Sequence, residues 1–278
     1  MKTVSVLIAA FQAESWLQDC LDSVLKQSLP TAWQMEVLLG VDGCRKTLEA
    51  ARSYNDPRIR ILYLSHNRGT YITFNTLMQH ATGDLICRFD ADDVMLEGFL
   101  SQQIPILESG KDITMTWSIY TDAELKPTSH VLAHEVYHPK NGLNRRGTEG
   151  QFIIWRYVWE ALGGFRAWRC GADTEFFIRL GHAGFRHTVV EDFLYLRRTH
   201  HQSLTTDSRT NFQSPRRLRI QALTQAYETH YGEGSKSTAV KARCEPEVSF
   251  INAATKDHPP PGTLKKNYRP GTLQARKE

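Results

Sequence analysis

Buried β-strands alternate with amphipathic helices along the first third of this chain, and this alternation limits the possible folds more than any other feature. Residues 4–10 form an almost continuous apolar run, which is typical of a strand that is covered on both faces. The helix that follows has one apolar stripe and ends before Pro30, and Ser15 and Gln18 predict a capping box at its start. Repeats of this length imply parallel strands joined by right-handed crossovers, and therefore an α/β fold with a mostly parallel sheet flanked by helices. Further strands are expected at 35–41, 59–65 and 85–89, and further helices at 46–54 and 71–81.

The pattern changes after Ser109, where irregular segments separate the expected elements. Residues 121–150 are polar and contain two prolines, so we expect a long loop there. Residues 213–231 have helical character, whereas the proline-rich, basic residues 256–278 are expected to be disordered. Strands are expected at 113–120, 151–155 and 189–197, and helices at 156–162 and 172–181.

The charge of the chain is small and unevenly spread. The 278 residues carry a net charge of +4, and residues 256–278 alone contain six Lys or Arg against two Asp or Glu. This balance disfavours a nucleic-acid-binding protein. The basic tail could contact an acidic membrane surface at the inner face of the membrane, although a solvated tail is the simpler interpretation. No apolar stretch approaches the length of a membrane span.

The cysteines indicate a reducing environment. Five are present, they are widely spaced, and none forms a Cys-x-x-Cys pair. An odd number of thiols cannot all pair within one chain, so a disulfide framework is disfavoured, as is a structural zinc site. The expected location is the cytoplasm.

Three carboxylates, Asp90, Asp92 and Asp93, follow the apolar residues 85–89. In an extended chain, side chains two positions apart point to the same side, so Asp90 and Asp92 can converge on one point. A divalent cation such as Mn²⁺ or Mg²⁺ would remove their mutual repulsion and could hold a diphosphate. The alternative is a helix cap, which would explain one of these carboxylates but not all three. The sequence therefore favours a metal site.

Polar residues also follow two other expected strands, at 12–14 and at Asp42-Gly43. Ligands bind at the carboxyl ends of the strands in such sheets, so we expect these residues and the three carboxylates to meet in one crevice. Two classes of enzyme place an Asp-x-Asp pair after a buried strand: haloacid-dehalogenase-like phosphatases and glycosyltransferases that use nucleotide sugars. Three strand–helix units precede the pair here, and no convincing later Lys with a second acidic pair follows, which favours a glycosyltransferase.

Several segments, taken in order, resemble motifs of the family 2 glycosyltransferases, which have the GT-A fold. They are "SVLIAAFQAESWLQDCLDSVLKQS", "VLLGVDG", "NRGTYITFN", "ATGDLICRFDADD", "GGFRAWRCGADTEFFIRL" and "RRTHHQSLT". The resemblance covers roughly residues 3–205, and the run that ends in the three carboxylates is its most specific part. The chain departs from the family at Phe74, where Arg is common, and at Ala172, which replaces Glu.

The resemblance implies roles for individual residues. Asp173 takes the position of the catalytic base, which removes a proton from the acceptor hydroxyl. Asp92 and His200 take positions that can bind the metal. Contacts with the acceptor are expected from Trp168, Arg169 and Glu175, and Glu175 is also an alternative base. The expected nucleotide-binding residues are Ala10, Phe11, Glu14, Asp42, Asn67, Gly69, Thr70, Asn75, Asp90 and Ala91.

The implied activity is that of an inverting, metal-dependent glycosyltransferase of polysaccharide or glycoconjugate biosynthesis. It would move a sugar from a nucleotide donor, UDP-linked in the simplest interpretation, to a hydroxyl of a saccharide or glycolipid. Residues 1–110 would form the nucleotide-sugar-binding half, residues 111–205 the acceptor-side subdomain with the base, and residues 206–255 a helical extension. Two alternatives stay open: a phosphohydrolase with Asp90 as nucleophile, and a non-catalytic module that binds nucleotide sugars.

Overall fold

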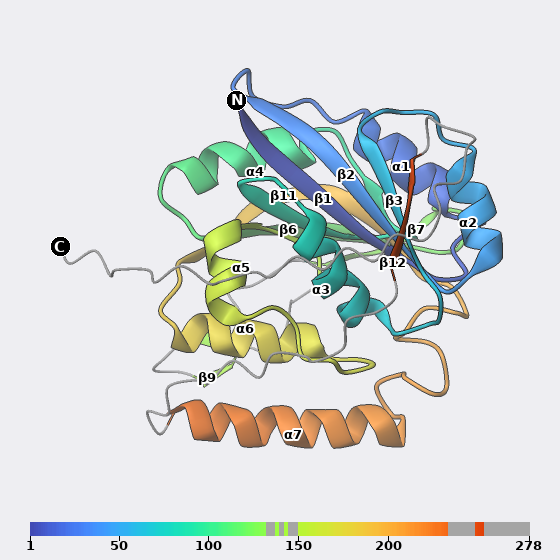
Figure 1. Ribbon diagram of the computed structural model, residues 1–278. Helices are drawn as coiled ribbons and strands as arrows, with labels where there is room; N and C mark the ends of the chain where they lie inside the picture. The colour runs from blue at the N-terminus through green and yellow to red at the C-terminus, as the bar shows by residue number, and fades with distance from the viewer. Residues whose placement is uncertain (132–136, 139–141, 144–149, 233–247, 253–278) are drawn as a thin grey trace.

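The computed structural model describes residues 1–131, 137–138, 142–143, 150–232 and 248–252, and Figure 1 shows the arrangement of their elements. The basic tail, which was expected to be disordered and for which a membrane contact was only one option, lies outside the described residues. Within the described part of the chain, no helix is both long enough and apolar enough to cross a membrane.

The strands are β1 (Lys2–Ala10), β2 (Trp33–Asp42), β3 (Ile59–Leu64), β4 (Leu85–Asp90), β5 (Val94–Met95), β6 (Ile113–Thr121), β7 (Pro127–Val131), β8 (Tyr137–His138), β9 (Gly142–Leu143), β10 (Phe152–Trp155), β11 (His187–Arg198) and β12 (Val248–Asn252). The helices are α1 (Leu17–Leu25), α2 (Arg45–Arg52), α3 (Thr70–His80), α4 (Phe99–Glu108), α5 (Arg156–Leu162), α6 (Ala172–His182) and α7 (Pro215–Gly232).

One large sheet forms the centre of the fold. Its strand order is β12-β3-β2-β1-β4-β10-β6-β11-β5, with β7 beside β6, and β8 pairs separately with β9. The strands β3, β2, β1 and β4 are parallel, as predicted. The register places Ala10 beside Val41, and Ala9 beside both Gly40 and Asp90. The carboxyl ends of β1, β2 and β4 therefore meet at one edge.

Helices cover both faces of this sheet (Figure 1). α1, α2 and α4 lie on one face, where Leu21 packs in the same core as Ile8 of β1. α3, α5 and α6 lie on the other face, where Phe176 packs in the same core as Leu7. Neighbouring residues of β1 thus belong to opposite cores, which explains its continuous apolar run. α7 lies alongside α6 on the outer side of this layer.

The second half of the sheet is less parallel than expected, because β10 runs antiparallel to both β4 and β6. The prediction of a loop at 121–150 is wrong at its start, where β7 pairs antiparallel with β6. The side chain of Asp122 accepts hydrogen bonds from the backbone N–H groups of Glu124 and Lys126, and this turn brings β7 back along β6. The segment expected to be a helical extension also contains β12, which pairs with the edge of β3.

Helix α1 begins without the predicted capping box. Its N-cap is Trp16, and no side chain forms a capping hydrogen bond there. The carbonyl oxygen of Ala13 instead accepts hydrogen bonds from the N–H groups of Trp16 and Leu17, at 2.9 and 2.8 Å. The prediction from Ser15 and Gln18 is therefore wrong, because a turn of the backbone starts this helix.

Candidate active site

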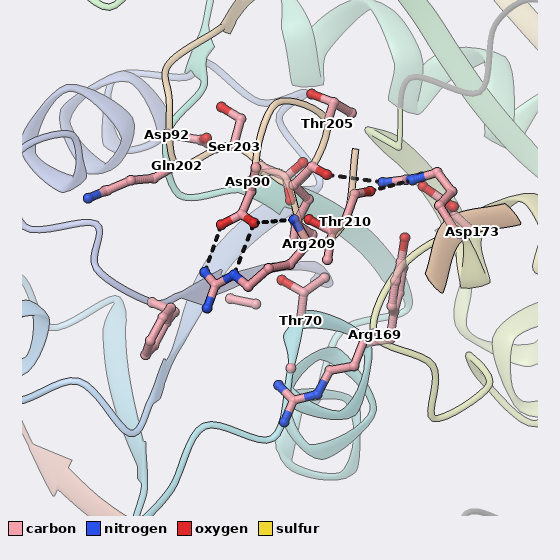
Figure 2. Close-up of a pocket in the computed structure, with 18 of the residues that line it drawn as sticks. Thr70, Asp90, Asp92, Arg169, Asp173, Gln202, Ser203, Thr205, Arg209 and Thr210 are labelled. Carbon is pink, nitrogen blue, oxygen red and sulfur yellow. Dashed lines mark hydrogen bonds and ion pairs between the residues drawn. The ribbon is translucent and has the colours of Figure 1, made fainter. Parts of the chain in front are cut away.

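A cleft of about 1180 Å³ lies at the carboxyl ends of β1, β2 and β4, where the polar residues were expected to meet. In the view of Figure 2, Asp90 and Asp92 lie to one side, and Asp173 and Arg169 lie to the other. Most of the predicted site residues line this cleft. They are Ala10, Phe11, Asp42, Asn67, Gly69, Thr70, Asp90, Ala91, Asp92, Arg169, Asp173 and His200.

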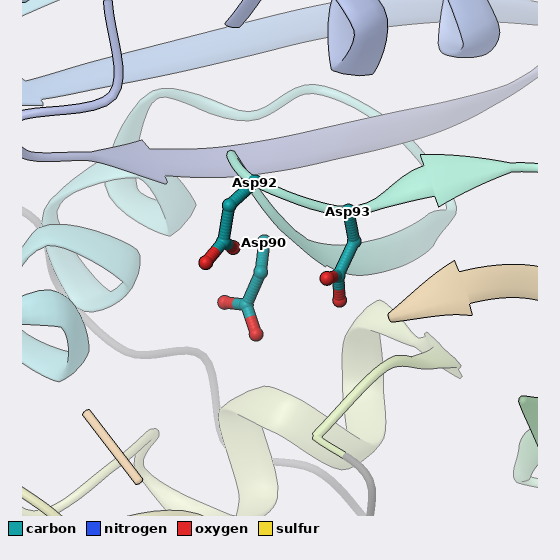
Figure 3. Close-up of side chains that lie close together, drawn as sticks. All are labelled: Asp90, Asp92 and Asp93. Carbon is teal, nitrogen blue, oxygen red and sulfur yellow. The ribbon is translucent and has the colours of Figure 1, made fainter. Parts of the chain in front are cut away.

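The three carboxylates of Asp90, Asp92 and Asp93 form one cluster. One oxygen of each lies within 4.8 Å of the others, and Figure 3 shows the three side chains directed to the same side of the chain. Asp93 is buried, whereas the side chains of Asp90 and Asp92 are 30% and 27% exposed. Asp90 and Asp92 are therefore the carboxylates that a ligand in the cleft can reach.

Residues at or beside the ends of two distant strands hold this cluster. Gln151, which precedes β10, donates hydrogen bonds from its amide to Asp90 and Asp93, at 2.9 and 2.6 Å. Arg198, at the end of β11, donates from its backbone N–H to Asp93 and from its Nε to the carbonyl oxygen of Asp92, both at 3.0 Å. The carboxylates are thus oriented by the fold itself.

His200 contacts the cluster from the segment that follows β11. Its Nε2 lies 3.0 Å from Oδ2 of Asp92, and its ring centroid lies 5.1 Å from that of Trp16. The structure therefore brings together the two residues that were expected to bind a metal. Their role as ligands stays a prediction.

Arg88 places a positive charge directly beside the cluster. Its guanidinium makes two contacts with Asp90, from Nη2 to Oδ1 at 2.8 Å and from Nη1 to Oδ2 at 2.9 Å. Nη1 also donates to the carbonyl oxygen of Gly150 at 2.7 Å, and the guanidinium carbon lies 4.8 Å from the centre of the Phe74 ring. Arg88 is buried, so water screens this ion pair only weakly.

The donor set of the cluster fits a hard divalent cation. Burial raises the pKa values of Asp90 and Asp93, and the negative charge of Asp92 raises both further, while Arg88 opposes the change at Asp90. A bound cation would relieve this repulsion, and carboxylate oxygens are the ligands that Mg²⁺ and Mn²⁺ prefer. Arg88 already binds an oxygen of Asp90, and Gln151 binds an oxygen of Asp93. The carboxylate of Asp92 is therefore the most available to a cation.

Asp42, at the end of β2, is tied to the loop before α3. Its carboxylate accepts hydrogen bonds from the backbone N–H groups of Arg68 and Gly69, both at 2.7 Å. Gly69 has a φ of +97°, which favours glycine at this position. Burial raises the pKa of Asp42, against the effect of these hydrogen bonds. The carboxylate therefore shapes the rim of the cleft, and its expected contact with the nucleotide stays a prediction.

Arg169 reaches the same loop from the other side of the cleft. Its guanidinium donates hydrogen bonds to the side-chain oxygen of Asn67 and, at 3.1 Å, to the backbone oxygen of Asn67. A residue expected to bind the acceptor thus contacts one expected to bind the nucleotide.

Asp173 lies in the first turn of α6. A carboxylate at this end of a helix is favoured by the helix dipole. The side chain of Tyr71 interacts with Asp173, and burial together with the negative charge of that carboxylate raises the pKa of the tyrosine. Asp173 and the carboxylate cluster therefore line the same cleft, as a catalytic base and a metal site would.

Four predicted site residues do not line the cleft. Glu14 accepts a hydrogen bond from the hydroxyl of Thr47 at 3.0 Å. Asn75 binds the backbone N–H and carbonyl oxygen of Phe165, at 2.9 and 2.8 Å. Trp168 packs against the core on the α3 and α6 side of the sheet.

Glu175 is the fourth residue, and its side chain is 0% exposed. It accepts hydrogen bonds from Arg166 at 3.1 Å and from Arg179 at 2.7 and 2.8 Å. A carboxylate held in this way cannot approach an acceptor hydroxyl. The geometry therefore fits neither the acceptor contact nor the alternative base, and Glu175 is a structural partner of two arginines.

Sequence reasoning assigned no role to Arg88, Gln151 or Arg198, which all contact the carboxylates. The sequence could have pointed to Arg88, because it is the one charged residue in the apolar run before Asp90. It could not have pointed to Gln151, since the position of that residue depends on how β10 pairs. The part of the chain at 202–225, including the first half of α7, also lines the cleft.

A sheet with an acidic cluster at the carboxyl ends of its central strands is the arrangement of GT-A glycosyltransferases, and solved structures of that class match this fold. TarS of S. aureus, in its complex with UDP-GlcNAc, matches with a TM-score of 0.63 at 15% identity, over 84% of this chain and 70% of that chain. The mannosyltransferase PcManGT from Pyrobaculum calidifontis, in complex with GDP-Man and Mn²⁺, matches with a TM-score of 0.53 at 16% identity, over 81% and 69%. These likenesses establish the fold.

The chain belongs to glycosyl transferase family 2, since the family model of that description matches residues 5–194. The putative glycosyltransferase EpsE of Bacillus subtilis (strain 168) is 24% identical over 202 residues, which are 69% of this chain and 71% of that protein. The putative teichuronic acid biosynthesis glycosyltransferase TuaG of the same organism is 30% identical over 106 residues, 37% of this chain and 41% of that protein. The protein is therefore a glycosyltransferase that acts on nucleotide sugars, and neither the phosphohydrolase nor the non-catalytic module is retained.

Proposed function

We propose that this enzyme transfers a sugar, with inversion and with the help of a divalent cation, from a UDP-linked donor to a hydroxyl of a saccharide or glycolipid. The observation that carries the proposal is a single cleft lined by the carboxylate cluster and by Asp173. Relatives named for teichuronic acid biosynthesis, and for glucosyl transfer from UDP-Glc to a diphosphoundecaprenol-linked sugar, support a place in polysaccharide or glycoconjugate biosynthesis. We expect a cytoplasmic location from the cysteines, and those within the described residues are free.

The donor binds on the side of the β1, β2 and β4 carboxyl ends. Phe11 is 44% exposed beside the cleft and offers its ring to the nucleobase. Asp92 and His200, with Asp90, would hold the cation, which would supply positive charge beside the diphosphate leaving group. Gln151 holds the carboxylate of Asp90, and Arg198 holds the backbone of Asp92, while the donor enters.

The acceptor hydroxyl approaches from the side of α6. Asp173 removes its proton, because a sugar hydroxyl is a poor nucleophile until it loses that proton. A single displacement with the base opposite the leaving group inverts the anomeric carbon, and no covalent intermediate forms.

Nucleotide release from a panel of UDP- and GDP-sugars, with saccharide acceptors, tests this function. We expect release with at least one UDP-sugar in the presence of Mn²⁺ or Mg²⁺, and loss of that release with EDTA. Release that EDTA leaves unchanged would contradict the role of the cation. Release from GDP-sugars alone would contradict the choice of donor.

Thermal unfolding gives a second readout that does not need the acceptor. UDP at a concentration of about 100 times its dissociation constant should stabilise the fold by about 2.7 kcal/mol. We expect this gain only when Mn²⁺ or Mg²⁺ is present, and we expect Asp92→Asn to abolish it because an amide cannot supply the charge that the cation needs. Equal stabilisation with and without EDTA would rule out binding of the diphosphate through metal.

A further inference from the structure

One wall of the cleft is much more basic than the rest, and the proposed reaction does not explain it. This wall is formed by the segment after β11 and by the first half of α7. Within residues 199–227 the chain has four arginines but only one acidic residue, Asp207. Three of those arginines, Arg209, Arg216 and Arg217, line the cleft.

Only one of the three arginines is neutralised by a carboxylate. Arg209 pairs with Asp207 at 2.7 Å. Arg216 is exposed, and its guanidinium has no hydrogen bond or ion pair with any residue that the structure describes. Arg217 donates to the backbone oxygens of Thr210 at 2.6 Å and Leu204 at 3.2 Å. Two positive charges therefore face the cleft without a negative partner.

The guanidinium of Arg217 is held in a fixed position. Besides its two bonds to backbone oxygens, it lies 5.0 Å from the centre of the Phe212 ring. A guanidinium has five N–H donors, and two of them are used in these bonds. The remaining donors can bind an anion at little further cost in side-chain entropy.

These charges line the same cleft as the proposed catalytic base, on a helix that packs beside it. α7 packs closely on the segment before α6, since a Cβ atom added to Gly171 would lie 3.2 Å from Cγ2 of Ile220. Gly171 is two residues before Asp173. The charges of Arg216 and Arg217 also reach Cys170, where they lower a pKa that burial raises. The wall therefore belongs to the side from which the acceptor hydroxyl approaches.

We propose that the acceptor is an anionic glycan, and that Arg216 and Arg217 bind its carboxylate or phosphate group while its hydroxyl faces Asp173. This inference rests on the proposed function, because it assigns the acceptor side of the same cleft. The donor diphosphate is a different anion, with its own site at the carboxylate cluster. Arg216 and Arg217 thus select the acceptor, whereas the cluster binds the donor.

Isothermal titration in the presence of UDP and Mn²⁺ tests the proposal with three probes of similar length. They are a hyaluronan oligosaccharide, which carries carboxylates, a glycerol phosphate oligomer, which carries phosphates, and a neutral N-acetylglucosamine oligomer. At low salt we expect at least one anionic probe to bind about tenfold or more tightly than the neutral one, and the advantage to shrink at high salt. The better anionic probe identifies the charged group. Equal affinity for all three probes would overturn the proposal.

The chain offers a matched control on the same helix. Arg216→Gln with Arg217→Gln should remove the preference for the anionic probe, whereas Arg219→Gln removes a charge from α7 outside the cleft lining and should leave the preference unchanged. If Arg219→Gln has the same effect, the preference reflects general charge and the proposal fails. If the double variant weakens UDP instead, the arginines serve the donor and the proposal also fails.

The same titrations separate this inference from the proposed function. Failure of UDP to bind the unaltered protein with Mn²⁺ would contradict the donor assignment. UDP binding without any anionic preference would contradict the acceptor class alone. Circular dichroism melting of the double variant shows whether it remains folded, and Arg217→Lys, which keeps the charge, should retain part of the preference.

Discussion

At the scale of single residues, the pairing of Arg88 with Asp90 accounts for an unusual position in the chain. The family resemblance implies an Arg where this chain has Phe74, and here the guanidinium of Arg88 lies over the ring of Phe74. The positive charge beside Asp90 thus comes from β4 and not from α3. Phe74 is 0% exposed and provides an apolar surface on which this charge stacks. The departure at position 74 therefore does not leave Asp90 without a cation.

Arg88→Met should lower the free energy of unfolding by about 3 kcal/mol, because it leaves the partly buried carboxylate of Asp90 unpaired. The double variant Arg88→Met with Asp90→Asn should be less destabilised than the sum of the two single variants. Urea unfolding of the four proteins measures this coupling. Strictly additive free energies would show that the pair contributes nothing to stability.

Asp173→Asn separates chemistry from donor binding. Loss of a general base typically costs about 10²–10⁴ in rate, so turnover should fall by that factor while the affinity for UDP stays close to its original value. Nucleotide release with acceptor and titration with UDP give the two readouts. Ala172, which takes the position where the family resemblance implies Glu, is 0% exposed, whereas Asp173 lines the cleft.

Glu175→Gln provides the contrast for that variant. The substitution breaks a buried pair with Arg166 and Arg179, so it should lower the melting temperature while the folded molecules keep their turnover number. Asp173→Asn with full turnover, together with a folded but inactive Glu175→Gln, would reverse the assignment of the base.

At the scale of elements, Glu36 links three strands and the turn before β4. Its carboxylate accepts hydrogen bonds from Ser5 of β1 at 2.6 Å, from the backbone N–H of Thr82 at 2.5 Å, and from Arg60 of β3 at 3.3 Å. Burial alone would raise the pKa of Glu36, but these partners outweigh burial and lower it. The ionised carboxylate thus stabilises the folded state.

The effect of pH on Glu36→Gln follows from the direction of that shift. A carboxyl with a lowered pKa contributes stability above its unfolded value of about 4.3, and the contribution is lost as pH falls through the lower folded value. The original protein should therefore exceed Glu36→Gln in stability at pH 7 and lose this advantage below about pH 4. Denaturant unfolding between pH 3 and 7 checks this, with the exposed Glu97→Gln as a control. A difference that does not change with pH would contradict it.

The elements differ in how well local sequence predicts them. β1 to β4 could be predicted, because strands covered on both faces are apolar throughout and helical stripes separate them. The antiparallel insertion of β10 between β4 and β6 could not be predicted, since strands that pair across a long stretch of sequence leave no local pattern. The same holds for β7, where a turn at Asp122 decides the structure, and for β12, which follows the edge of β3.

At the scale of the whole molecule, some residues of the candidate site could be predicted from the sequence and others could not. Residues at the ends of β1, β2 and β4 could be placed in the cleft from sequence, because topology brings those ends together. Gln151 and the arginines of α7 could not, since long-range packing carries them there. Asn75 and Glu175 lie in recognisable motifs, but the structure uses them to hold other parts of the chain.

Two links join the donor-side and acceptor-side rims of the cleft, one in the cleft lining and one outside it. Arg169 holds Asn67, and Asn75 holds the backbone of Phe165. One rim therefore cannot open without breaking bonds to the other, although about 90 to 100 residues separate them along the chain. In hydrogen exchange, amides at 66–69 and 165–171 should behave as one cooperative unit with a shared opening free energy. Arg169→Met should speed exchange in both segments together, and faster exchange in only one of them would show that the rims open separately.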